Sequence, residues 1–136
     1  MAPCQLSRRV VDDATGRWIE ATSCRCGDDQ VIAVGGGDRP HVGVVVVAQP
    51  DPRSTPDRPR SPSITVVTIP PHKDEAVARP VAEAVCQAIG RTTVVTAGVH
   101  EDELDREGVE TYLRLARRLA AVLVEALQEN HGGPDS

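Results

Sequence analysis

Three of the four histidines are the residues of this sequence best suited to chemistry: His41, His72 and His100. Neutral imidazoles bind Zn, Fe, Mn or Co, and a set of three leaves coordination positions open for a further ligand. The carboxylates that stand near them in the sequence are Asp38, Asp74, Glu101 and Asp102. The alternative is that each histidine only ends a strand and hydrogen-bonds to backbone groups.

A run of three glycines precedes the first of these histidines: Gly35, Gly36 and Gly37. Successive glycine amides can form an anion-binding nest, but a tight hairpin loop that needs positive φ explains the run equally well. Lys73 and the amides at the start of the helix predicted after it favour a phosphate, which Arg39 could also reach. The alternative is that Asp74 is an ordinary helix cap and that both cations are solvated surface residues.

No side chain is predicted to be catalytic. No serine stands in the sequence context of a nucleophile elbow, and Cys86 falls on or near the buried face of a predicted helix. The spacing of Cys24 and Cys26 is not that of a zinc site. Any chemistry would therefore belong to a metal or to a bound cofactor.

The elements that must position these residues are predicted in the order β-β-β-β-α-β-α. Apolar periodicity and turn residues place strands at about 17–23, 31–34, 44–47, 63–69 and 92–97, and helices at 74–89 and 106–128. We expect an α+β fold, a single two-layer domain with a five-stranded, mostly antiparallel sheet and two helices on one face. The domain would span 17–129 and include a proline-rich loop at 50–63, with a flexible arm at 1–16 and a disordered tail at 130–136.

The direction of the chain brings the histidines to one edge of this sheet. The strand at 44–47 starts after His41, at the edge where the strand at 31–34 ends. The strand at 63–69 returns to that edge before His72. The strand at 92–97, expected to lie parallel to the strand at 63–69, ends there at His100. Because ligands commonly bind at the carboxyl ends of such strands, we predict one site on this rim.

The composition excludes several function classes. A formal charge of −5, with one Trp, one Tyr and no Phe, argues against nucleic acid as a partner. The longest apolar run, 42–48, is too short to span a membrane, and the N-terminus lacks the apolar core of a secretory signal. We therefore expect a cytoplasmic protein. Because its core must be built from small aliphatic side chains, we also expect a homodimer or larger homo-oligomer.

Three segments, read together, carry a resemblance to a known family. They are Gly35-Gly-Gly-Asp-Arg-Pro-His-Val-Gly43, His72-Lys-Asp74 and Thr96-Ala-Gly-Val-His100. They resemble the Gly-Gly-x-x-Pro-His-Ile-Gly, His-Lys-Asp and Ala-Gly-Ile-His segments of the prenylated-flavin chaperone-like family of the LpdD type. Members of this family are small accessory subunits of gallate and related hydroxyarylic acid decarboxylases. The resemblance covers about 31–127, with Val in place of Ile.

The resemblance implies that the protein binds prenylated FMN (or FMN) and stores, matures or delivers it to a decarboxylase. It implies that His41, His72 and His100 bind either a divalent metal (Mn, Fe or Zn) or the cofactor. The cofactor-binding residues that it implies are Gly35, Gly36, Gly37, Arg39, His41, His72, Lys73, Gly98 and His100.

This sequence departs from the family pattern at two places, and two other functions stay open. Pro80 is expected to bend or shorten the helix that follows His72, and the proline-rich loop at 50–63 is peculiar to this chain. Little besides Trp18 could stack on a flavin ring. The alternatives are a stand-alone metal-dependent enzyme acting on a phosphorylated small molecule, and a purely structural decarboxylase subunit.

Overall fold

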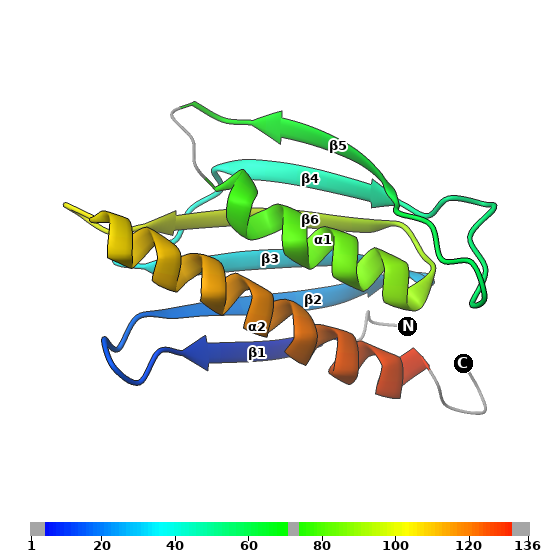
Figure 1. The fold of residues 1–136 in the computed structure, drawn as a ribbon, viewed down its shortest axis with the longest axis horizontal. Helices are drawn as coiled ribbons and strands as arrows, with labels where there is room; N and C mark the ends of the chain where they lie inside the picture. Colours follow the sequence, from blue (N-terminus) through cyan, green and yellow to red (C-terminus); the bar gives the residue numbers. More distant parts are fainter. Residues whose placement is uncertain (1–4, 71–73, 132–136) are drawn as a thin grey trace.

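The computed structural model describes residues 5–70 and 74–131, with side chains as far as residue 129. One sheet carries two helices packed side by side on one of its faces (Figure 1). The strands are β1 (Gln5–Val11), β2 (Trp18–Cys26), β3 (Asp29–Gly37), β4 (Val44–Gln49), β5 (Ser63–Thr68) and β6 (Thr93–His100). The helices are α1 (Glu75–Ile89) and α2 (Arg106–His131). No helix in this part of the chain is long and apolar enough to cross a membrane.

The sheet has the strand order β1-β2-β3-β6-β4-β5, and only the β3–β6 pair is parallel. The predicted α+β fold, with two helices on one open sheet, is confirmed. The predicted number of five strands is wrong, because the sixth strand, β1, lies where we expected a flexible arm. β1 is an edge strand that exposes most of its side chains, with only Val10 buried. Its sequence therefore lacks the apolar alternation that identifies a half-buried strand.

The sequence predicted the direction of β6 but not its neighbours in the sheet. β6 pairs with β3 on one side and with β4 on the other, so it is not the neighbour of β5. The connection through α1 skips over β4, which the crossover rule does not exclude. β5 and β6 still run in the same direction, since each is antiparallel to β4. The inference that both end at the same edge of the sheet therefore holds.

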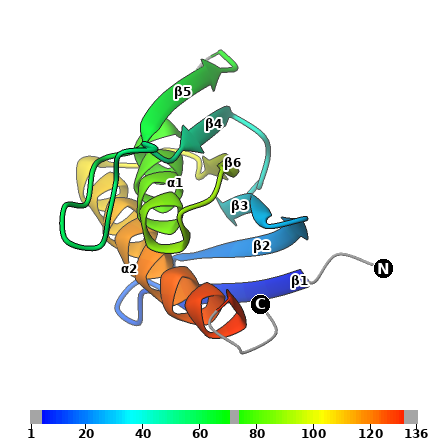
Figure 2. The same ribbon diagram turned by 90° about the vertical axis from the view of Figure 1, so that its right-hand side faces the viewer.

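Small aliphatic side chains fill the core between the sheet and the helices. Alternate residues of the strands face the helices, among them the fully buried Ile19, Ile32, Val46 and Val95. The side chains that meet them from the helices include Val81, Val85, Leu119 and Leu123. In the described part of the chain, both helices lie on one face and no helix covers the other face of the sheet (Figure 2). The cation–π contact of Arg9 with Trp18, 4.2 Å from guanidinium to ring centroid, is made by two residues from adjacent strands.

The helices begin and end close to where the sequence placed them. α1 continues through Pro80 without interruption, so the expected shortening does not occur. It ends at Gly90, which adopts the left-handed conformation (φ 67°) and donates its N–H to the carbonyl of Cys86. Asp105 caps α2 and accepts the N–H of Gly108 at 2.8 Å.

Candidate functional site

The connection from β3 to β4 runs along the end of β6 and brings two of the predicted histidines together. The amide of Asp38 donates to the carbonyl of His100 (2.6 Å), and the amide of Gly43 donates to that of Ala97 (2.9 Å). His41 lies between these two anchor points. Its imidazole ring is 6.4 Å from that of His100, centroid to centroid, with the ring planes at 75°. His72 and Lys73 lie outside the described residues, so their place on this rim stays a prediction.

Gly98 and Gly37 lie where the backbone of the β3–β4 connection crosses close to the backbone at the end of β6, which leaves no room for a side chain. A Cβ atom at Gly98 would collide with the carbonyl of His41, and one at Gly37 would collide with the carbonyl of His100. Gly37 also has φ of 75°, which favours glycine. Gly35 and Gly36 are paired residues of β3, between β2 and β6. The structure thus gives the glycines a packing role, and their contact with a cofactor stays a prediction.

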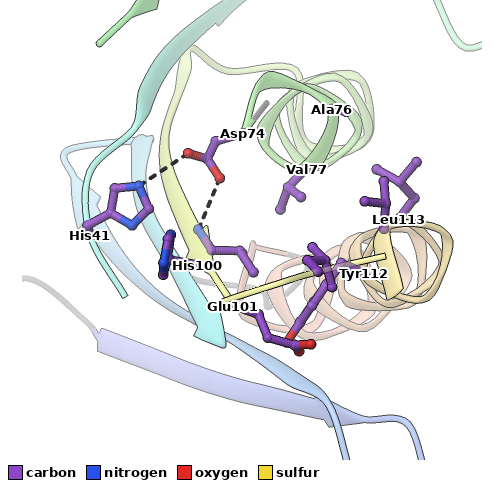
Figure 3. Close-up of a pocket in the computed structure, with 11 residues that line it drawn as sticks. His41, Asp74, Ala76, Val77, His100, Glu101, Tyr112 and Leu113 are labelled. Atoms are coloured by element: carbon purple, nitrogen blue, oxygen red, sulfur yellow. Dashed lines mark hydrogen bonds and ion pairs between the residues drawn. The ribbon is translucent and has the colours of Figure 1, made fainter. Parts of the chain in front are cut away.

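Asp74 connects three elements at the centre of the rim (Figure 3). Its Oδ1 accepts the backbone N–H of Val99 in β6 at 3.0 Å, and its Oδ2 lies 3.3 Å from Nε2 of His41. The carboxylate is 10% exposed. Although Asp74 stands at the N-cap position of α1, its side chain makes no capping hydrogen bond. The carboxylate instead orients the imidazole of His41.

His100 belongs to a more exposed cluster. Its Nε2 lies 2.9 Å from the guanidinium of Arg39 and 2.9 Å from Oδ1 of Asp102, and the two charged groups are themselves 3.0 Å apart. The hydrogen bond to His100, reinforced by the charge of Arg39, lowers the pKa of Asp102. Arg39 is therefore held by Asp102 at the rim, and its predicted contact with a phosphate requires it to leave this partner.

A cavity of about 530 Å³ opens beside this rim, between the end of β6 and the first turns of both helices. His41, Asp74 and His100 line its polar side (Figure 3). Its apolar walls are Ala76, Val77, Val99, Leu104, Val109 and Leu113. A mostly apolar cavity of this size with a few polar groups on one side is typical of a small-molecule site.

Glu101 and Tyr112 complete the lining, and Arg17 holds Glu101 from behind. The guanidinium of Arg17 makes two hydrogen bonds of 3.0 Å to the carboxylate of Glu101, and the hydroxyl of Tyr112 donates to the same carboxylate at 2.8 Å. These bonds lower the pKa of Glu101, that from Arg17 most. Burial, followed by the hydrogen bond to Glu101, raises the pKa of Tyr112. The carboxylate is thus kept ionised and fixed at the cavity wall.

The sequence did not identify Arg17 or Tyr112 as site residues. Arg17 is 84 positions from its partner, so no local spacing pointed to the pair. Tyr112 lies on the buried face of α2, where an aromatic side chain is explained by packing alone. A buried tyrosine hydroxyl needs a partner, and that requirement was the available signal.

The predicted metal site gains no support from the part of the chain that the structure describes. No group of three His, Cys, Asp or Glu side chains there could hold a metal ion. The Nε2 atoms of His41 and His100 face different carboxylates, those of Asp74 and Asp102. A metal bound by His41, His72 and His100 stays a prediction, because His72 lies outside the described residues.

The chain matches one known protein family and is similar in fold to a solved structure. Residues 13–128 match the family model described as the prenylated flavin chaperone LpdD-like domain. No curated protein matches the sequence. Among solved structures, the chain is similar to one from the crystal structure of a novel chaperone complex for yeast 20S proteasome assembly. The TM-score is 0.60 and the identity 14%, over 93% of this chain and 98% of that one. At this identity the likeness is one of fold.

Proposed function

Because the chain belongs to the prenylated flavin chaperone LpdD-like family, we propose that the cavity at the end of β6 binds the ring system of prenylated FMN. The observation that supports this most directly is the combination of apolar walls with two imidazoles at one side. The protein would hold the cofactor and deliver it to a prenylated-FMN-dependent decarboxylase. This assigns the protein a binding role and no catalytic residue.

The cavity fits the ring system better than the phosphate. A volume of about 530 Å³ lies within the usual range for small-molecule sites, and side chains such as Val77, Leu104 and Leu113 provide flat apolar contact. The charged side chains of the lining are the carboxylates of Asp74 and Glu101, which disfavour an anion. The phosphate would therefore lie outside this cavity, near the start of α1, where the sequence places Lys73.

Four of the polar residues that line the cavity have a part in the proposed binding: His41, Asp74, Glu101 and Tyr112. Asp74 on Nε2 and the carbonyl of Arg39, 3.2 Å from Nδ1, hold the imidazole of His41 in one orientation, so that the ring would present a fixed contact surface to the flavin. Glu101 is fixed by Arg17 and Tyr112 and closes the polar side against water. The bound flavin would supply its own electron-transfer and addition chemistry. Since the described residues alone form no metal site, no part of the proposal depends on a metal.

The test is a titration of the protein with prenylated FMN, and separately with FMN, followed by flavin absorbance and fluorescence. Ala76→Trp fills the cavity from an exposed position in α1 and should weaken binding at least about tenfold. Ala121→Trp, an exposed position on α2 that is not part of the lining, is the matched control and should bind as the wild type does. His41→Ala should weaken binding while leaving the fold intact.

Two results would contradict the proposal. The first is the absence of flavin binding to a folded wild-type protein, which would favour the structural-subunit alternative. The second is equal affinity of Ala76→Trp and wild type, which would place the flavin elsewhere on the molecule. Repeating the titration with and without added Mn, Fe or Zn tests the metal expected from the sequence, because affinity that depends on the metal requires ligands beyond those described.

A further inference from the structure

Within residues 5–70 and 74–131, one of the two edges of β5 pairs with no other strand. β5 is bonded to β4 on one side and ends the sheet on the other (Figure 1, upper strand). The amide of Ile69, just beyond β5, donates to the carbonyl of Gly43 across this ladder at 3.0 Å. Because backbone groups alternate in direction along a strand, the residues that point their N–H and C=O groups outward are Ile64, Val66 and Thr68.

This edge carries no charge. Residues 61–70 read Ser-Pro-Ser-Ile-Thr-Val-Val-Thr-Ile-Pro, in a chain of formal charge −5, and prolines bracket the strand at both ends. A β-branched, uncharged edge strand is a ready template for pairing with another strand, and proteins usually protect such edges. Val67 and Ile69 add exposed apolar surface, at 56% and 43% of their full areas.

The opposite edge of the same sheet is protected. β1 carries the adjacent cations Arg8 and Arg9, and the guanidinium of Arg118 from α2 donates to the backbone carbonyl of Val11 at 3.0 Å. Charged side chains on an edge strand discourage pairing with other chains. The two edges therefore differ in the feature that decides whether a sheet can be extended.

We propose that β5 pairs antiparallel with β5 of a second copy of this chain, forming one continuous sheet. The outward residues are symmetric about Val66, so a two-fold axis through Val66 pairs it with itself and pairs Ile64 with Thr68 of the other copy. All three outward residues then exchange hydrogen bonds, whereas a shift of the register by two residues leaves one of them unpaired. In this register, the β5 side chains that face the helices lie on the helix-covered face of the extended sheet in both copies.

A second copy fits this edge better than an unrelated chain does. An edge without charges has no group that would repel an identical strand or select a different one. The axis places both pairs of helices on the same face and the two cavities at opposite ends of the extended sheet. The dimer therefore does not complete the flavin site, and the failure of one proposal leaves the other standing.

The test is disulfide cross-linking through single cysteines, in a background where Cys4, Cys24 and Cys26 are replaced by serine. In the proposed register the two Val66 Cα atoms lie about 5.5 Å apart, within reach of a disulfide. The two Val67 residues are offset by two positions and lie at about 7–8 Å. Val66→Cys should thus cross-link under mild oxidation roughly tenfold faster than Val67→Cys, although Val67 is the more exposed.

A second measurement uses light scattering after size exclusion over a range of concentrations. Thr68→Pro removes an outward N–H without removing a bond to β4, and should give a monomer with an unchanged circular dichroism spectrum. Thr68→Val keeps the N–H and should stay dimeric. A wild-type protein that is monomeric at every concentration would overturn the proposal. So would a dimer in which Val67→Cys cross-links as readily as Val66→Cys, which would move the interface to another surface.

Discussion

Removing the carboxylate of Asp74 tests whether this residue joins the three elements of the rim. In Asp74→Ala, the amide of Val99 loses its acceptor, and the imidazole of His41 loses the group that orients it. Both contacts are formed by a side chain that is only 10% exposed, so water replaces them poorly. The start of α1 would then be held against β6 by apolar packing alone.

The expected loss of stability follows from the bonds that disappear. Leaving a partly buried amide without its charged acceptor reduces the free energy of unfolding by about 1–3 kcal/mol. For a chain of this size a loss of about 2 kcal/mol lowers Tm by roughly 6–12 °C. Asp74→Asn keeps an acceptor for Val99 but removes the charge facing His41, and should lose about half as much.

Chemical denaturation, followed by circular dichroism, measures these differences directly. The matched control is Glu75→Ala, one position along the chain, whose carboxylate is 45% exposed and lies 3.8 Å from Arg79. That pair is a solvent-exposed helix pair, and its removal should change stability by less than about 0.5 kcal/mol. If Asp74→Ala is no less stable than Glu75→Ala, then Asp74 does not hold the rim together and the reasoning fails.

Two further predictions concern the cavity wall and the crossing of the backbones. Because the folded-state pKa of Glu101 is lowered, its contribution to stability is present above the ordinary value of 4.5 and is lost as the pH falls below it. The denaturation midpoint of wild type should therefore fall more steeply between about pH 5 and pH 3 than that of Glu101→Gln, and parallel curves would contradict the role given to Arg17. Gly98→Ala should reduce stability by about 1–3 kcal/mol and abolish flavin binding, since its Cβ collides with the carbonyl of His41. If Gly98→Ala binds flavin as tightly as wild type does, the backbone at His41 can move away from β6 and the reasoning fails.

The sequence predicted every element except one strand. Both helices and the strands that became β2, β3, β4 and β6 bury alternate or stripe positions, which apolar periodicity detects. β5 buries no side chain fully, but its run of β-branched residues between prolines still identifies a strand. β1 buries one side chain and therefore leaves no such pattern. The crossover rule gave the direction of β6 correctly but not its neighbours, which depend on how many strands the connection skips.

Strand direction was sufficient to predict which histidines meet in the candidate site, but not their hydrogen-bond partners. The ends of β3 and β6 coincide, and His41 and His100 were expected to meet there. The partners of these histidines were not predictable in the same way, since a hydrogen bond between Asp74 and Val99 depends on side-chain orientation. The pair of Arg17 and Glu101 joins segments that come together only in the complete sheet.

The central position of β6 also governs the order in which the molecule can assemble during synthesis. Until residues 93–100 have left the ribosome, the meander of β1 to β3 and the hairpin of β4 and β5 have no strand to join them. Each nascent piece presents an open edge, and such long-range pairing forms late. The rim shared by His41, Asp74 and His100 exists only after that insertion. Occupancy of the cavity by a ligand would therefore distinguish finished molecules from incomplete ones.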